Sequence, residues 1–124
     1  MKKLFFLILT LSCLNAFSIS NDLMERIQLI EQCSQDVLEA LDTGDRDLAC
    51  SIIKDELKKP AKGLLALVEE ETNNEEAINN AGRIRQHAIV LKVSCGHGIS
   101  AKHIKEKIED ILDRLEEIEK SLQE

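Results

Sequence analysis

The feature of this chain that most constrains its fold is an apolar stripe whose members recur at alternating steps of four and three residues. Such spacing follows one face of an α-helix and is typical of the packing seams of helical bundles and coiled coils. A β-strand needs alternation at every second residue, which is not found over any useful length. We therefore expect an all-α protein. The three uninterrupted stripes are Leu23, Ile27, Ile30, Ser34, Val37 and Leu41; Ala77, Ala81, Ile84, Ala88, Leu91 and Cys95; and Ile104, Ile108, Ile111, Leu115, Ile118 and Leu122.

A fourth stripe, between residues 46 and 71, is less regular because Pro60 interrupts it. A proline inside a helix removes one backbone hydrogen bond and bends the helix axis. The alternatives are one long helix, kinked or split at Pro60, and two short helices over 46–58 and 60–71. The long helix is favoured because it gives four rods of comparable length. The stripe consists of Ile53, Leu57, Ala61, Leu64 and Val68.

The helices are expected at about residues 22–42, 46–71, 75–95 and 101–123. Their short connections force neighbouring helices to run antiparallel, which predicts an up-down four-helix bundle. A helical hairpin that completes its core as a homodimer is the alternative, and the 101–123 helix is then the dimer surface.

Residues that favour helix ends stand at these expected boundaries. Gly44 follows the first helix, where a left-handed residue is wanted. Thr72 and Glu75 have the spacing of a capping box before the third helix. The other predicted caps are Ser20, Asn21 or Asp22 for the first helix, Asp45 or Asp47 for the second, and Ser100 for the last, with Ile99 and Ile104 as its hydrophobic staple.

Residues 1–18 form a separate block that is typical of a secretion signal. Lys2 and Lys3 precede an apolar run over 4–11, and small residues end the block, which predicts cleavage after Ser18 or Ser20. The run is too short to span a bilayer. We therefore expect a single helical domain, 19–124, that is secreted or periplasmic and has no membrane span when mature. Lipid anchoring through Cys13 is a minor alternative.

Composition excludes several kinds of partner. All three Phe lie in residues 1–18, and the chain has no Trp or Tyr. Its net charge is −7, and removal of the signal makes it more acidic. Nucleic-acid binding normally requires basic patches or aromatic stacking platforms, so no nucleic-acid partner is expected.

Three cysteines, Cys33, Cys50 and Cys95, remain after the signal. A secreted protein favours a disulfide, but three is an odd number. At 1.5 Å per residue, all three fall at the end of the bundle that carries the turn at 43–45. In one interpretation Cys95 bonds Cys33 or Cys50, contributes roughly 4 kcal/mol by closing a long loop, and leaves one buried thiol. In another, all three are reduced core residues.

A third interpretation joins the same cysteines to His97 in a zinc site, because Cys₃His is a known set of zinc ligands. Only Cys95 and His97 are close in sequence, whereas structural zinc sites usually hold two close pairs. Catalysis by Cys95 would need His97 or His103 as a base and a third group to orient it, and nothing marks such a group. We therefore expect no enzyme activity and no cofactor.

The segment 94–100, SCGHGIS, is most simply a turn between helices. Gly96 and Gly98 are expected to let the chain leave the third helix, while His97 has no structural role. His87 is expected to be half-exposed and His103 to lie in the first turn of the last helix. Four charge pairs spaced i,i+4 are expected on a solvated face: Lys102–Glu106, Lys105–Glu109, Asp110–Arg114 and Glu116–Lys120.

These patterns and absences predict a protein that acts by binding another protein. It is either an envelope or host-facing interaction protein or an inhibitor of the immunity type, which neutralises an enzyme. A metal-binding module that uses Cys33, Cys50, Cys95 and His97 is the alternative.

Overall fold

The computed structural model describes residues 20–123, with only the backbone of Gln123. This part of the chain is helical and contains no strand, so the all-α prediction is confirmed. The predicted signal peptide and Cys13 lie outside the described residues. The elements are α2 (Asn21–Asp42), α3 (Arg46–Ile52), the π-helical turn η2 (Ile53–Leu57), α4 (Lys58–Glu71), α5 (Glu75–Cys95) and α6 (Ala101–Gln123).

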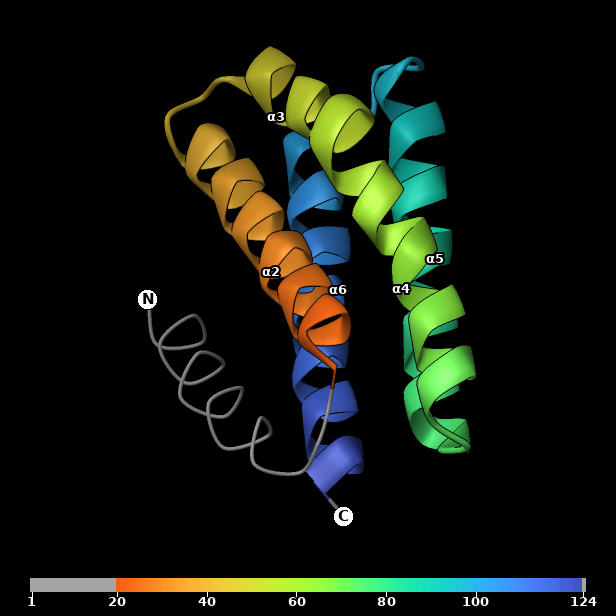
Figure 1. Cartoon of the computed structure of the whole chain (residues 1–124). Helices are drawn as coiled ribbons and strands as arrows, with labels where there is room; N and C mark the ends of the chain where they lie inside the picture. Colours follow the sequence, from red (N-terminus) through yellow and green to blue (C-terminus); the bar gives the residue numbers. More distant parts are fainter. Residues whose placement is uncertain (1–19, 124) are drawn as a thin grey trace.

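These elements form four rods, because α3, η2 and α4 follow one another without a break. Helix α4 packs on α5, α5 packs on α6, and α2 packs against both α4 and α6 (Figure 1). The rods therefore close into an antiparallel four-helix bundle, as predicted. None of the helices in the described part is long and apolar enough to cross a membrane.

The second rod bends at η2, one turn before Pro60 (Figure 1). A proline ring crowds the carbonyl four residues earlier, and for Pro60 that carbonyl belongs to Glu56, within η2. A π-helical turn is wider than an α-helical one and accommodates such crowding. The prediction of a single kinked helix is thus confirmed, and the kink itself lies at residues 53–57.

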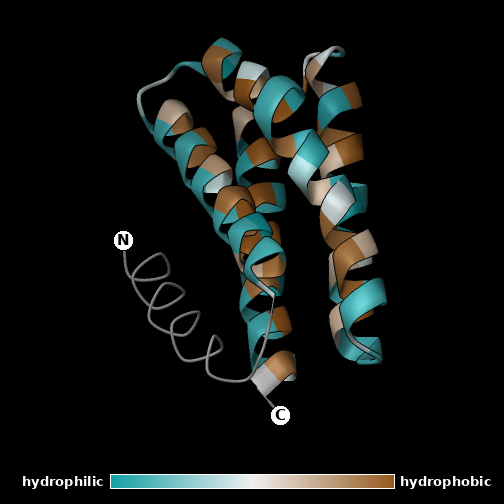
Figure 2. Cartoon of the chain, viewed as in Figure 1, coloured by the Kyte–Doolittle hydropathy of each residue, from teal (hydrophilic) through white to brown (hydrophobic). Residues whose placement is uncertain are grey.

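The predicted stripes form the core. Every apolar residue of the four stripes is buried except Leu41, Cys95 and Leu122, which lie at helix ends and are partly exposed. Figure 2 shows the hydrophobic residues on the inward faces of the rods. The stripe of α6, a candidate dimer surface, is completely buried within one chain from Ile104 to Ile118. It is therefore already occupied and does not support the hairpin dimer.

Three helix caps are confirmed. The Ser20 hydroxyl accepts a hydrogen bond from the Leu23 amide (3.1 Å), and the Asp45 carboxylate accepts one from the Leu48 amide (3.0 Å). The Ser100 hydroxyl accepts one from the His103 amide (3.2 Å).

The capping box predicted for Thr72 and Glu75 is wrong. Asn74 caps α5, because its Oδ1 accepts a hydrogen bond from the Ala77 amide (3.0 Å). Its Nδ2 also donates to the Ser121 carbonyl of α6 (2.9 Å). Thr72 instead donates back to the Val68 carbonyl (3.0 Å) at the end of α4.

The segment 94–100 is a turn, as predicted, but its two glycines differ. Gly98 has a φ of 77°, in the left-handed region that favours glycine, whereas Gly96 has a helical φ of −72°. The turn is closed by bonds from the amides of His97 (2.9 Å) and Ile99 (3.2 Å) to the Ser94 carbonyl. Only Gly98 therefore requires the conformational freedom of glycine here.

Candidate functional site

Cys50 and Cys95 lie at the end of the bundle where α2 meets α3 and α5 meets α6, and Cys33 lies near the middle of α2. Cys50 of α3 and Cys95 of α5 form a disulfide, with their Cα atoms 5.8 Å apart and 45 residues between them in sequence. Cys33 of α2 is a free, buried thiol. The structure thus agrees with the first interpretation of the cysteines and identifies Cys50 as the partner of Cys95.

Cys33 has a different environment from the other two cysteines. Burial raises the pKa of its thiol to about 11, and the carboxylates of Glu56 and Asp36 raise it further. A thiol that stays protonated is a poor nucleophile and a poor metal ligand. Cys33 is therefore a buried core residue with a thiol that should react slowly.

The residues of the alternative zinc site do not form a metal-binding group. The sulfurs of Cys50 and Cys95 are bonded to each other, and Cys33 lies in the core. Within residues 20–123, no three His, Cys, Asp or Glu side chains are arranged to hold a metal ion.

A hollow of about 340 Å³ lies between the end of α2 and the start of the second rod. We call it the acidic hollow, because three carboxylates surround an apolar floor. Leu48 in that floor is 49% exposed, although it is a large apolar side chain. The carboxylates are Asp36, Glu39 and Glu56, and the apolar residues are Ala40, Leu48 and Ile52.

The acidic hollow shares two carboxylates with the surroundings of Cys33. Asp36 and Glu56, which raise the pKa of the Cys33 thiol, also line the hollow. Asp36 accepts a hydrogen bond from Gln32 (3.0 Å). The side chains of Glu39 and Glu56 have no hydrogen-bond or ion-pair partner among the described residues. Two of the three carboxylates are therefore free to bind a cation.

A second hollow, of about 460 Å³, lies between the last two turns of α5 and the first two turns of α6. We call it the basic hollow, because its titratable residues are two histidines and a lysine and no carboxylate lines it. His97, for which no structural role was predicted, and His103 line it together. The lining residues are Val90, Ser94, His97, Ile99, His103 and Lys107.

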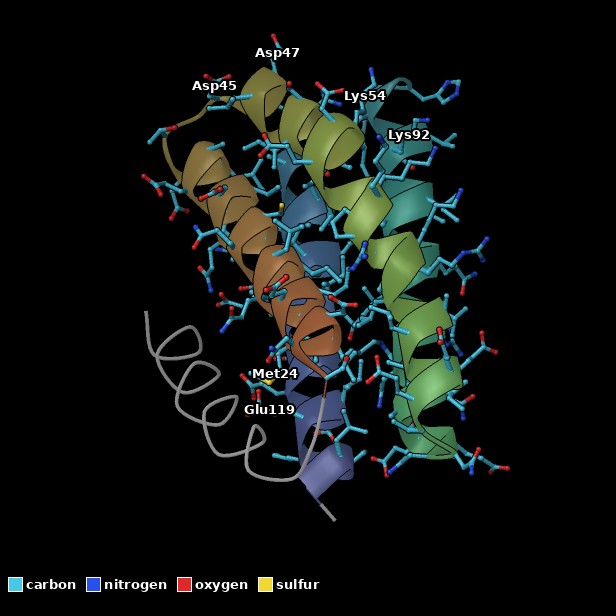
Figure 3. The ribbon with its side chains drawn as sticks, viewed as in Figure 1. Met24, Asp45, Asp47, Lys54, Lys92 and Glu119 are labelled. Atoms are coloured by element: carbon cyan, nitrogen blue, oxygen red, sulfur yellow. A yellow bond between two sulfur atoms is a disulfide. The ribbon has the colours of Figure 1, made fainter. Side chains whose placement is uncertain are left out.

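The loop that borders the basic hollow is held in place from α3. The Nε of Arg46 donates a hydrogen bond to the carbonyl of Ile99 (2.7 Å). One turn along each chain segment, the disulfide joins Cys50 to Cys95. A small hollow of about 290 Å³ lies over this disulfide and is lined in part by Asp47 and Lys54. Figure 3 labels both side chains at this end of the bundle.

A polar network continues the α5–α6 seam below the basic hollow. The Nε2 of His87 donates to the Oδ2 of Asp110 (2.6 Å), which also accepts from the Nε of Arg114 (2.8 Å). Arg114 reaches back to the Oδ1 of Asn80 (2.9 Å). Burial by itself raises the pKa of Asp110, but the hydrogen bonds from Arg114 and His87 outweigh it, and the net pKa is lowered. The network ties α5 to α6.

Sequence reasoning missed this network. The predicted Asp110–Arg114 pair is confirmed, but Asp110 also contacts His87 of α5, whose side chain is only 13% exposed instead of half-exposed. One feature of the sequence could have indicated that these polar side chains lie together. Asn80 and His87 are seven residues apart and so share a face of α5, next to the apolar stripe. Of the other expected charge pairs, Lys120 contacts Glu117 (3.8 Å) instead of Glu116.

A group of lysines lies on the outer faces of the second rod and α5. Lys54, Lys58 and Lys62 follow one another at i,i+4 spacing, and Lys92 of α5 contacts Lys58. Contact with the ammonium of Lys92 lowers the pKa of Lys58, and Lys62 adds to this effect. These lysines have no ion-pair partner among the described residues.

Comparison with known proteins gives no relative from which a function can be transferred. No protein-family model matches the chain, and no curated protein and no solved structure is similar to it.

Proposed function

We propose that this protein is a small secreted or periplasmic binding protein whose acidic hollow receives a basic side chain of a protein partner. It acts as an envelope or host-facing interaction protein, or as an inhibitor that neutralises a basic enzyme in the manner of an immunity protein. The acidic hollow is the observation that supports this function, because it joins exposed apolar surface to unpaired carboxylates.

The chemistry of the acidic hollow fits an arginine or lysine from a partner. The aliphatic part of such a side chain can pack on Leu48 and Ile52, while its charged end pairs with Glu39 and Glu56. Arginine is among the residues that contribute most to protein interfaces. A volume of about 340 Å³ has room for one long side chain.

Long-range electrostatics supports the same kind of partner. The chain has 23 acidic and 16 basic residues, for a net charge of −7. Such a charge speeds the association of a partner of opposite sign and disfavours acidic ones.

A secretory location is supported by two features. Residues 1–18 have the pattern of a signal peptide. The Cys50–Cys95 disulfide is typical of oxidising compartments such as the periplasm and the extracellular space.

The proposal is tested by affinity capture from envelope and secreted fractions with three forms of the protein. These are the wild type, the Glu39→Lys/Glu56→Lys variant, and a control, Glu69→Lys/Glu70→Lys. The control makes the same charge change at exposed residues in the last turn of α4, outside the acidic hollow.

We expect the wild type and the control to retain the same basic protein and the Glu39→Lys/Glu56→Lys variant to lose it. Equal retention by both variants would show that the acidic hollow is not the binding surface. If no protein is retained by any form, the protein-binding function loses its support.

A further inference from the structure

The basic hollow has the dimensions and position of a small-molecule site. Its volume of about 460 Å³ falls in the range of about 300–1,000 Å³ that is usual for ligand pockets. It opens at the junction of α5 and α6, and both the Cys50–Cys95 disulfide and the Arg46–Ile99 hydrogen bond hold the loop between these helices. Its shape therefore does not depend on a free loop.

Four polar side chains of the basic hollow are free to bind a ligand. The hydroxyl of Ser94, the imidazoles of His97 and His103 and the ammonium of Lys107 all line it. Their side chains make no hydrogen bond or ion pair within the described residues. All four can donate a hydrogen bond, and Lys107 supplies an ammonium group.

A carboxylate on the same seam, that of Asp110, is already paired. Asp110 lies one turn after Lys107 on α6, but its Oδ2 already accepts from His87 and Arg114. The negative end of the α5 dipole and the positive end of the α6 dipole meet at this junction and oppose each other, so the preference for an anion rests on the lysine and the hydrogen-bond donors that line the hollow.

The apolar residues of the hollow indicate what kind of anion fits. Val90 is 40% exposed and Ile99 is partly buried, so both present apolar surface to a ligand. The hollow has no arginine, the usual bidentate partner of a phosphate dianion, and no Phe, Tyr or Trp on which a nucleotide base could stack. The single ammonium of Lys107, beside the aliphatic side chains of Val90 and Ile99, matches a monoanion that carries an aliphatic chain.

We propose that the basic hollow binds a small organic carboxylate, with the carboxylate between Lys107, His103 and Ser94 and the aliphatic chain against Val90 and Ile99. The site is separate from the acidic hollow, so either site can exist without the other.

The probe is hexanoate, titrated into the isotope-labelled protein while amide and imidazole NMR signals are recorded. Hexan-1-ol is the neutral control, and inorganic phosphate is the purely inorganic anion. We expect hexanoate to shift the signals of Ser94, His97, His103 and Lys107 saturably, and the other two compounds to bind at least about tenfold more weakly, because each lacks one of the two recognition elements.

Two variants and a matched control test the site at positions outside the buried core. Lys107→Gln should weaken hexanoate binding about tenfold, whereas Lys105→Gln, an exposed lysine on the same helix outside the hollow, should leave it unchanged. Val90→Glu adds a carboxylate at a 40% exposed position and should abolish binding.

Several results would overturn the proposal. Equal weakening by Lys107→Gln and Lys105→Gln would indicate attraction to overall charge only. Equal binding of hexan-1-ol would indicate a purely apolar patch, and tighter binding of phosphate would indicate a general anion site. Shifts of His97 and His103 by Zn²⁺ but not by hexanoate would assign the two histidines to a metal.

Discussion

The acidic hollow and the basic hollow lie at the same end of the bundle, yet they carry opposite charges. The acidic hollow lies between α2 and the second rod, and the basic hollow lies between α5 and α6. The disulfide stands between them, because Cys50 is two residues from Leu48 of the first and Cys95 follows Ser94 of the second. The carboxylates of the acidic hollow and the lysine of the basic hollow therefore lie on different pairs of helices. The Cys50–Cys95 disulfide links these two pairs.

The largest expected effect comes from breaking the bond between the two hollows. The Cys50→Ala/Cys95→Ala variant should lose about 2–4 kcal/mol of the free energy of unfolding, because the bond closes a loop of 45 residues. Urea unfolding measures this loss. Cys33→Ala is the control, since Cys33 is buried but unbonded, and its loss should be smaller. If the control loses as much, the disulfide does not stabilise the connection between the hollows.

Glu119 lies outside both hollows, and its variant measures how much a buried, unpaired carboxyl lowers the free energy of unfolding. It is 1% exposed, and neither carboxylate oxygen has a hydrogen-bond partner among the described residues. Figure 3 shows it beside Met24 of α2. Burial, with a smaller contribution from Glu116, raises the pKa of Glu119 to about 8. The folded state therefore keeps its proton at pH values where the unfolded chain has released it.

As a result, the stability of the wild type should fall as pH rises from about 4.5 to about 8. Glu119→Gln removes this dependence and should make the protein more stable than the wild type above pH 8. Urea unfolding at a series of pH values measures the difference. A variant that is no more stable than the wild type at pH 9 would show that Glu119 is solvated in the folded protein.

Asp110, below the basic hollow, should behave in the opposite way because it is paired. Asp110→Asn should lower the free energy of unfolding by up to about 1 kcal/mol at neutral pH, since the carboxylate is 41% exposed and partly screened by water. Glu109→Gln, an exposed neighbour, is the control. Because the pKa of Asp110 is lowered, its stabilisation should be present above its ordinary value of 3.8 and be lost as pH falls through the lowered pKa.

Urea unfolding between pH 2 and pH 7 of the wild type and Asp110→Asn checks this expectation. The two curves should differ most near neutral pH and converge at low pH. A constant difference would show that the amide disturbs packing and that the ion pair with Arg114 and the bond from His87 contribute nothing.

The smallest expected effect concerns the wall of the acidic hollow. Glu56→Gln should lower the pKa of Cys33 slightly and so raise its rate of alkylation at pH 8 by about two- to threefold. Burial still dominates, so the thiol should remain slow to react. Mass spectrometry of the Cys33 peptide after timed treatment with iodoacetamide measures the rate. An unchanged rate would place Glu56 away from the thiol.

Much of the fold could be predicted because it depends on short-range periodicity. The four-three spacing identified the core residues, and Ser20, Asp45 and Ser100 were recognisable as caps. The cap of α5 was not recognisable in the sequence. Asn74 also bonds to the Ser121 carbonyl, and Ser121 is distant in sequence.

The two hollows could not be predicted from the sequence for the same reason. Each hollow combines residues of two rods. The spacing of apolar residues along one helix does not indicate which polar faces of different helices lie side by side. Thus the sequence did not predict that His97 and His103 line one hollow, or that Glu56 of the second rod and Asp36 of α2 line the other.

The most direct test of the partner-binding function is hydrogen–deuterium exchange of the protein alone and in complex with the captured partner. If the acidic hollow is the binding surface, protection on binding should be greatest over residues 36–43 and 48–56, which line it. Protection confined to α5 and α6, or to the opposite end of the bundle near Asn74, would contradict this account.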